Sequence, residues 1–238
     1  RMIKSIDQLL PTILQKEKIV KIENNYLLIG DRRELPFKND YVKCSSIDEI
    51  AKALKEMATQ GGGPLQVGLT TLNFVAQQIE KGKMADSINT FIKAVHTLVQ
   101  ARPTNTTMAR SLYKVIDRLS MHYQCSLIAT VNDVDLVTFV NQIVTELEHS
   151  FDNDYLKMGE YGSSLIEDGF SILTTCFAEH SFMLSLMKAQ KEGKKVEIYL
   201  NETRPYFQGS RLTAFALEEL GIDFHIIGDS AGSNLMNL

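Results

Sequence analysis

Apolar residues recur at helical spacing through most of the first 150 residues. Ser46, followed by Asp48 and Glu49, forms a capping signal, and the apolar residues after it share one helical face: Ile47, Ile50, Ala51, Leu54 and Met57. The same spacing predicts further helices over residues 72–79, 88–98, 108–123 and 136–148. Before them, the apolar run 26–29 ends at Gly30-Asp31 and predicts a hairpin strand within a small β element at residues 26–37.

The hydrophobic pattern changes after Gly159. Short apolar runs at residues 171–174, 196–200 and 224–227 predict buried strands, and segments 180–191 and 211–220 predict the helices between them. Strands and helices that alternate through short connections form parallel βαβ units. The sequence therefore predicts an α/β protein, in which residues 1–150 form a mainly helical domain with a small β element and residues 151–238 form a Rossmann-like parallel-sheet domain.

The predicted sheet has few strands for an open α/β domain. The third strand comes just before the last residues of the chain, and an uncovered parallel edge strand is a liability. We expect this domain to be truncated at its C-terminus, as part of a longer protein, and we expect a homodimer that covers its apolar surface.

Polar residues follow each predicted strand of the second half. Thr175-Cys176 follows the first strand, the charged turn 201–204 follows the second, and Gly228-Asp229 follows the third. Open parallel sheets bind ligands at the carboxyl ends of their strands, so a thiol, a charged turn and a carboxylate should meet at one edge. Taken alone, Cys176 is either a reactive thiol at a helix N-terminus or a small buried hydrophobe, and Asp229 is either an acid or a helix cap.

The first half contains two further candidates for ligand binding. Gly61, Gly62 and Gly63 form a run that either exposes main-chain N–H groups to a phosphate or makes a simple turn. Arg102, before Pro103-Thr104, is either an anion clamp or part of a helix start signal.

Composition and charge narrow the class of protein. The 238 residues have 44% hydrophobic and 23% charged side chains, which is the composition of a globular protein. A net charge of −4 argues against a nucleic-acid binder, and the apolar runs are too short to span a membrane. Three cysteines without CxxC spacing, no HExxH pattern and no signal-peptide pattern argue against disulfides, structural metal and export, so we expect a cytoplasmic protein.

Residues 201–214, Asn-Glu-Thr-Arg-Pro-Tyr-Phe-Gln-Gly-Ser-Arg-Leu-Thr-Ala, resemble the signature loop of the S-methyl-5-thioribose-1-phosphate isomerases. That superfamily also contains ribose-1,5-bisphosphate isomerase and the regulatory subunits of translation initiation factor 2B. Other segments are similar in the same order: 31–36 (Asp-Arg-Arg-Glu-Leu-Pro), 102–104 (Arg-Pro-Thr), 159–162 (Gly-Glu-Tyr-Gly), 172–176 (Ile-Leu-Thr-Thr-Cys) and Asp229. The chain departs from the family at its phosphate loop, where Gln60 precedes Gly61 and the family's arginine is absent.

The resemblance implies a sugar-phosphate isomerase of methionine salvage that converts 5-methylthioribose 1-phosphate to 5-methylthioribulose 1-phosphate. It implies Asp229 as the acid and Cys176 as the base, with substrate held by Gly61, Gly62, Gly63, Arg102 and Gln208. No cofactor or metal is required, because the reaction is redox-neutral within the sugar. Two alternatives are a non-catalytic subunit like those of initiation factor 2B, and an isomerase of another ribose 1-phosphate, such as ribose 1,5-bisphosphate; the joint presence of Cys176 and Asp229 favours an enzyme.

Overall fold

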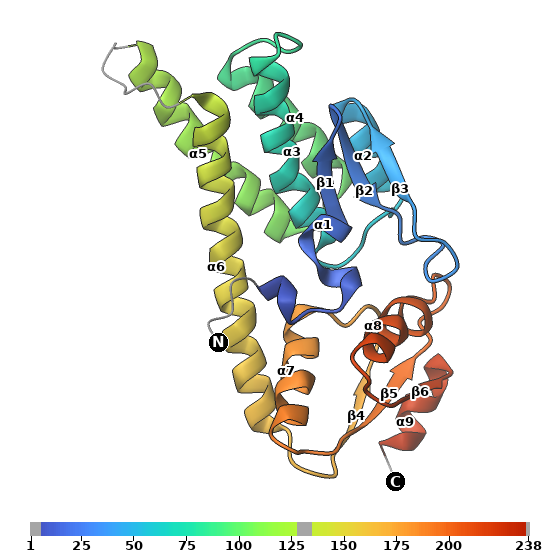
Figure 1. The fold of residues 1–238 in the computed structure, drawn as a ribbon. Coiled ribbons are helices and arrows are strands. Elements are labelled where there is room, and N and C mark those ends of the chain that lie inside the picture. The colour runs from blue at the N-terminus through green and yellow to red at the C-terminus, as the bar shows by residue number, and fades with distance from the viewer. Residues whose placement is uncertain (1–5, 128–134, 237–238) are drawn as a thin grey trace. The chain divides into compact units, whose positions relative to one another are not determined.

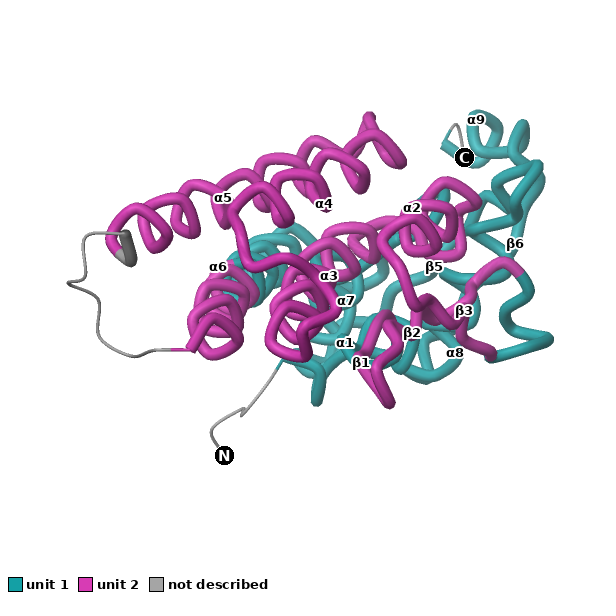
Figure 2. Tube along the Cα trace, turned by 90° about the horizontal axis from the view of Figure 1, so that it is seen from above, with its two compact units in different colours: residues 1–18, 34–39, 151–238 teal, residues 19–33, 40–150 magenta. Residues whose placement is uncertain are grey.

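The computed structural model describes residues 6–127 and 135–236, which fall into two compact units (Figures 1 and 2). A helical unit contains residues 19–33 and 40–150, and an α/β unit contains residues 1–18, 34–39 and 151–238. The longest helix, α6 (Leu136–Leu165), contributes to both units, and the short helix α1 (Lys16–Ile19) ends at their boundary.

The helical unit begins with a three-stranded antiparallel sheet in the order β1 (Val20–Glu23), β2 (Tyr26–Gly30), β3 (Tyr41–Cys44). Asn24 and Asn25 join the first two strands, and both have positive φ angles (50° and 66°), as a two-residue hairpin turn requires. The predicted strand at residues 26–29 is therefore the central strand of this sheet, paired on both sides.

In the described residues, the sheet is followed in this unit by α2 (Ile47–Lys55), α3 (Gly63–Glu80), α4 (Ile88–Ala101) and α5 (Thr106–Leu127). The predicted capping signal is confirmed, because the Ser46 hydroxyl accepts the N–H of Glu49, whose carboxylate accepts the N–H and hydroxyl of Ser45. The core combines the buried residues of the sheet with those of the helices, among them Leu27, Ile29, Leu72, Phe74, Phe91, Leu98, Met108 and Leu112.

The α/β unit contains the predicted parallel sheet, in the order β4 (Ser171–Thr174), β5 (Glu197–Asn201), β6 (Phe224–Ile227). Helix α7 (His180–Lys191) connects the first two strands; a π-helical turn (Gly209–Thr213) that continues into α8 (Ala214–Glu219) connects the second and third. A 3-10 turn (Asp229–Ala231) and the short helix α9 (Gly232–Leu235) follow β6. Parallel strands alternating with helices are thus confirmed.

The α/β unit is not formed by the residues after 150 alone, as a single division of the chain at that point would give. Its buried cluster joins Ile198 and Leu200 of β5 to residues of α7 and α8, and it also includes Leu10, Leu14 and Leu35. Two early segments therefore belong to this unit because their apolar side chains complete its core.

Helix α6 continues well beyond the predicted end at residue 148. It passes through Gly159 and Gly162, where the sequence pattern indicated a change of structure. A Cβ at Gly159 would lie 2.7 Å from Cβ of Leu184, and one at Gly162 would lie 2.1 Å from Oγ of Ser185. The two glycines therefore permit close packing of α6 on α7, and they do not end the helix.

Of the helices in the described ranges, none is both long and apolar enough to cross a membrane.

Candidate functional site

The carboxyl ends of the three parallel strands are linked by hydrogen bonds through Thr203. The N–H of Cys176, after β4, donates to Oγ1 of Thr203, after β5, over 2.8 Å. The N–H of Thr203 in turn donates to Oδ1 of Asp229, after β6, over 2.7 Å, and the N–H of Arg204 donates to Oδ2 over 2.9 Å. The thiol, the charged turn and the carboxylate therefore meet at one edge of the sheet, as the strand pattern predicted.

Cys176 is an exposed free thiol with a left-handed main chain. Its φ angle is 62°, which is uncommon for a residue other than glycine and costs about 1–3 kcal/mol of local strain. Its carbonyl accepts the Thr213 hydroxyl over 2.7 Å, so hydrogen bonds hold its main chain on both sides. The alternative of a small buried hydrophobe does not describe this side chain.

Asp229 is exposed at the start of the 3-10 turn and does not cap that turn. Its two oxygens instead accept main-chain N–H groups of the loop after β5. A carboxylate has about four lone-pair positions, so both oxygens can still accept a hydrogen bond or a proton from a ligand. The alternative of a plain helix cap is therefore excluded.

The loop 202–209 is held by contacts within itself. Nε of Arg204 donates to Oε1 of Glu202 over 2.8 Å, and the guanidinium lies 4.9 Å from the centre of the Phe207 ring. The hydrogen bond that Arg204 donates to Glu202 raises the pKa of Arg204, so this side chain is cationic at any working pH. Two non-glycine residues of the loop, Thr203 and Phe207, have positive φ angles of 61° and 57°.

Gly209 closes this loop against the end of β5. A Cβ at this position would lie 1.8 Å from the carbonyl oxygen of Asn201, so the close approach requires glycine. The preceding residue, Gln208, is buried, with 7% of its surface exposed. Gln208 therefore lies in the loop after β5, next to the glycine that packs on the end of that strand.

Arg211 connects the loop to an early segment of the chain. Its Nη2 donates to the carbonyl of Tyr206 over 2.7 Å, and its Nη1 donates to the carbonyl of Leu35 over 2.8 Å. Leu35, from the motif at residues 31–36, is therefore linked within the α/β unit to the motif at residues 201–214, far away in sequence.

The glycine run lies in the helical unit at the start of α3. Gly61 has a φ angle of 63°, and Gly62 is the N-cap of this helix. A Cβ at Gly63 would lie 1.9 Å from Oγ1 of Thr59, so the main chain turns tightly around the Thr59 side chain. The N–H of Gly63 donates to the carbonyl of Gln60 over 3.0 Å, and Pro64 has no N–H. What the start of this 18-residue helix offers an anion is therefore the positive end of its dipole.

Arg102 lies beside the residues that lead into this glycine run. Its Nη1 donates to the carbonyls of Leu54 (3.3 Å) and Thr59 (3.4 Å). Partial burial lowers the pKa of Arg102, and in residues 6–127 and 135–236 no carboxylate lies within ion-pair distance of it. The structure therefore places Arg102 at Thr59, just before the run Gly61–Gly63, in the helical unit. In the α/β unit it brings Cys176 and Asp229 to one sheet edge, and Gln208 lies in the loop that follows β5.

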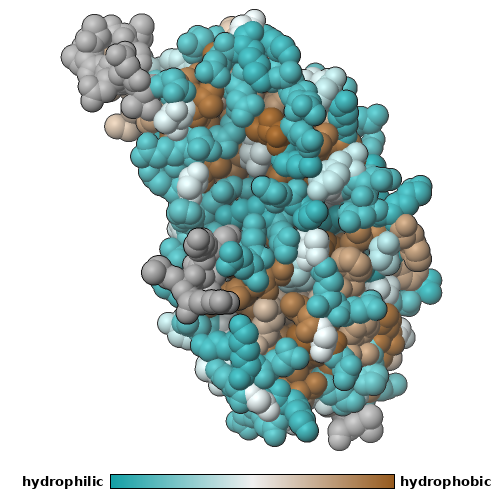
Figure 3. Space-filling model, in the orientation of Figure 1, coloured by the Kyte–Doolittle hydropathy of each residue, from teal (hydrophilic) through white to brown (hydrophobic). Residues whose placement is uncertain are grey.

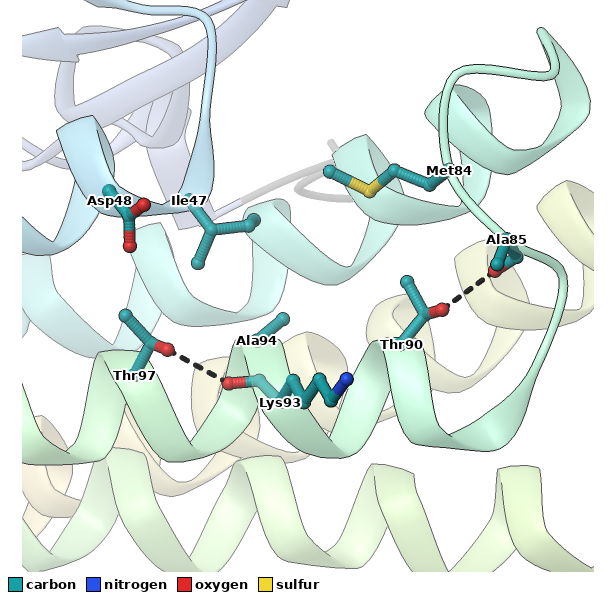
Figure 4. A pocket seen from close by; sticks show the side chains of 8 residues that line it. All are labelled: Ile47, Asp48, Met84, Ala85, Thr90, Lys93, Ala94 and Thr97. Atoms are coloured by element: carbon teal, nitrogen blue, oxygen red, sulfur yellow. Dashed lines mark hydrogen bonds between the residues drawn. The ribbon is translucent and has the colours of Figure 1, made fainter.

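A pocket of about 260 Å³ in the helical unit contains none of the predicted site residues (Figure 4). Residues from the start of α2, from the connection after α3 and from α4 line it: Ile47, Asp48, Met84, Ala85, Thr90, Lys93, Ala94 and Thr97. The hydroxyls of Thr90 and Thr97 donate to nearby main-chain carbonyls, and Asp48 and Lys93 are the charged residues of the lining.

Sequence reasoning missed Thr203, Thr213 and Arg211, which organise the strand ends. Each acts through main-chain groups of residues distant in sequence, and threonine or arginine inside a loop motif carries no specific signal for such contacts. Across the described residues, no group of three or more histidine, cysteine or acidic side chains has the geometry to hold a metal ion.

Comparison with known proteins places these elements in a family. Residues 64–238 match the Initiation factor 2 subunit family. Methylthioribose-1-phosphate isomerases from Caldicellulosiruptor saccharolyticus and Thermotoga maritima are 30% and 31% identical over 93% of this chain. The chain spans 65% and 64% of the lengths of these two relatives, which is less than two thirds.

Solved structures have the same fold. The 5-methylthioribose 1-phosphate isomerase from Pyrococcus horikoshii superposes with a TM-score of 0.73 at 23% identity, over 92% of this chain and 62% of that one. The delta subunit of translation initiation factor eIF-2B from A. fulgidus superposes with a TM-score of 0.67 at 24% identity, over 92% of this chain and 64% of that one. Together with the match over residues 64–238, this shows that the chain belongs to the Initiation factor 2 subunit family.

Proposed function

We propose that the protein is an aldose–ketose isomerase that converts 5-methylthioribose 1-phosphate to 5-methylthioribulose 1-phosphate. The observation that carries this proposal is the exposed thiol of Cys176 and the exposed carboxylate of Asp229 at one sheet edge, each one hydrogen bond from Thr203. The names of the isomerase relatives add the substrate class, a small sugar phosphate.

The chemistry requires two groups with different tasks. The anomeric phosphate prevents spontaneous ring opening, so an acid must protonate the ring oxygen as the ring opens at C1. A base must then take the proton from C2 and deliver it to C1 through a cis-enediol that keeps the phosphate on O1. The O2 hydroxyl loses its proton as the carbonyl forms at C2, and this proton restores the acid. In this proposal Asp229 protonates the ring oxygen and the Cys176 thiolate carries the C2 proton.

The helical unit would supply the phosphate site. Arg102 is a partly buried cation, and the run Gly61–Gly63 leads into the positive end of a long helix, so together they offer the positive charge that a phosphate prefers. This arrangement would compensate for Gln60, where the family has arginine. Gln208 would hold the sugar hydroxyls.

The proposal is tested by measuring ketose formation with the full-length protein on 5-methylthioribose 1-phosphate and on ribose 1,5-bisphosphate. We expect turnover of the methylthio sugar in the ordinary range of about 1–10³ per second, with a lower kcat/KM for the bisphosphate. Preference for the bisphosphate would assign the protein to the ribose-1,5-bisphosphate isomerase branch of the superfamily. Absence of turnover by folded protein would refute the proposal and favour a non-catalytic subunit, the role that the structural likeness to an eIF-2B delta subunit suggests.

Reaction in deuterated water separates the two routes from C2 to C1. A thiolate that carries the proton exchanges it with solvent, so the ketose gains deuterium at C1. A direct hydride shift retains the original hydrogen. We expect deuterium in the product, and its complete absence would remove the base role from Cys176.

A further inference from the structure

The main chain at Cys176 has a conformation that needs external restraint. Its φ angle of 62° lies in the left-handed region, and only one residue, Thr175, separates it from β4. A residue other than glycine returns to negative φ unless its surroundings fix both of its peptide groups. The contacts of those two peptide groups therefore decide where the thiol points.

Thr203 fixes the first peptide group from the end of the neighbouring strand. Its hydroxyl accepts the N–H of Cys176 over 2.8 Å and donates to the carbonyl of Asn201 over 3.1 Å, so the direction of the hydroxyl proton is set. Thr203 itself has a φ angle of 61°, which is exceptional for a β-branched residue, and its N–H is held by Asp229.

Thr213 fixes the second peptide group from the turn before α8. Its hydroxyl donates to the carbonyl of Cys176 over 2.7 Å and accepts the N–H of Ala178 over 3.0 Å. The side chain is completely buried, so no water competes for these two hydrogen bonds. Two threonine hydroxyls, from different elements, thus bind the main chain on either side of one exposed thiol.

We propose that Thr203 and Thr213 are positioning residues for Cys176, whose hydroxyls hold it in the left-handed conformation and so aim its thiol at the substrate. Neither threonine touches the reacting atoms. The inference deepens the proposed function and rests on it, because the direction of the thiol affects the reaction only if the thiol transfers a proton. Removal of either hydroxyl leaves one peptide group of Cys176 unrestrained and allows φ to relax.

The test replaces each threonine by valine, which keeps the shape and loses the hydroxyl, in the full-length protein. For Thr203→Val and Thr213→Val we expect kcat to fall about tenfold or more while KM changes less than about threefold, because positioning acts on the transition state. Thr203→Ser, which keeps the hydroxyl, should restore kcat to within about threefold of the unmodified protein. The control Thr97→Val removes a hydroxyl that bonds only to its own helix, and it should leave kcat unchanged.

A second readout does not depend on isomerase activity. Iodoacetamide alkylates exposed thiols, and mass spectrometry of the peptides follows Cys176 with the exposed Cys125 as internal reference. We expect the Cys176 rate to fall about threefold or more in both valine variants, with the Cys125 rate unchanged. If the unmodified protein has no isomerase activity, the proposed function fails while this measurement still tests the positioning.

Unchanged kcat and an unchanged Cys176 alkylation rate in the valine variants would overturn the inference. If the buried Thr213→Val variant fails to fold, the loop variant Thr203→Val decides alone. A lower kcat accompanied by a lower thermal unfolding temperature and a raised KM would indicate that the threonines have a merely structural role. That result would also overturn the inference.

Discussion

Cys44 and Cys176 have the same side chain in opposite environments. Cys44 ends β3 with none of its surface exposed, and burial, together with the nearby Glu49 charge, raises the pKa of its thiol to about 11. Cys176 is exposed beyond a strand end, with its main chain held by two hydroxyls. Residue type alone therefore does not separate an inert thiol from a candidate base, whereas burial does.

Replacement of Cys176 by serine tests the base role. The serine hydroxyl is a far weaker acid than a thiol, so we expect Cys176→Ser to lower kcat by about 10³-fold or more and to leave KM nearly unchanged. Steady-state kinetics of the isomerase reaction measure both constants. Cys125→Ser, at another exposed free cysteine, is the matched control and should behave as the unmodified protein. A kcat within about tenfold of normal would contradict the role.

Replacement of Arg102 by alanine tests the phosphate site. Loss of a charge-assisted hydrogen bond to phosphate should raise KM about tenfold or more. Arg102→Lys should reverse only part of this increase in KM, because lysine lacks the planar guanidinium with its paired N–H donors. Arg118→Ala is the control, since that side chain only forms an exposed ion pair with Glu146. An unchanged KM in Arg102→Ala would place the phosphate elsewhere.

The raised pKa of Cys44 predicts a loss of stability at alkaline pH. The thiol ionises near 9.0 in the unfolded chain and near 11 in the fold, so the unfolded state gives up its proton first. The contribution of Cys44 to stability is therefore complete below pH 9.0 and is lost as the pH rises towards 11. Denaturant unfolding at neutral pH and between pH 9.0 and 11 measures this loss. The free energy of unfolding should decrease less with pH for Cys44→Ala than for the unmodified protein. Equal decreases would refute this assignment.

At the scale of elements, close packing explains why two glycines lie inside a helix. Glycine in a helix interior is about 1 kcal/mol less favourable than alanine, so propensity alone predicts a break at Gly159 and Gly162. Contact between α6 and α7 overrides this preference, because a Cβ at either position would collide with Leu184 or Ser185. The helix therefore continues past Gly159, where the sequence pattern changes, and ends at Leu165.

Gly159→Ala tests which effect is larger. Helix propensity predicts that the free energy of unfolding rises by about 1 kcal/mol, whereas overpacking against Leu184 predicts that it falls by about 1–3 kcal/mol. We expect a net decrease in the urea midpoint. The control Ser164→Ala, at an exposed position of the same helix, should change stability by less than about 0.5 kcal/mol. A stabilised Gly159→Ala variant would show that the two helices have room to separate.

At the scale of the whole molecule, the α/β unit presents apolar surface that a second copy could cover. The outer edges of β4 and β6 pair with no other strand in the described part of the chain. Large apolar residues near this sheet are exposed, including Ile226 (49%) and Phe170 (40%), and apolar surface gathers over this region in Figure 3. Exposed strand edges and apolar faces favour association, which is the basis for a homodimer formed through this unit.

Light scattering of the full-length protein tests this expectation. We expect the mass of a dimer over a wide range of concentrations, and Ile226→Asp should shift it towards monomer by placing a charge in the contact. Met121→Asp introduces the same charge at an exposed apolar residue of the helical unit and should stay dimeric. A monomer at every concentration would exclude the homodimer.

The sequence by itself determined the elements whose causes are local. Period-2 and period-3.6 patterns predicted the parallel strands and most helices, the Ser46 cap was readable, and parallel strands necessarily brought Cys176, residues 201–204 and Asp229 to one edge. Only the tertiary structure decided what depends on contacts between distant residues. These are the inclusion of Leu10, Leu14 and Leu35 in the α/β core, the continuation of α6 through two glycines, and the hydrogen bonds by which Thr203 and Thr213 hold the main chain of Cys176. A one-dimensional pattern records the period of a segment, but it does not record which main-chain groups a side chain will meet after folding.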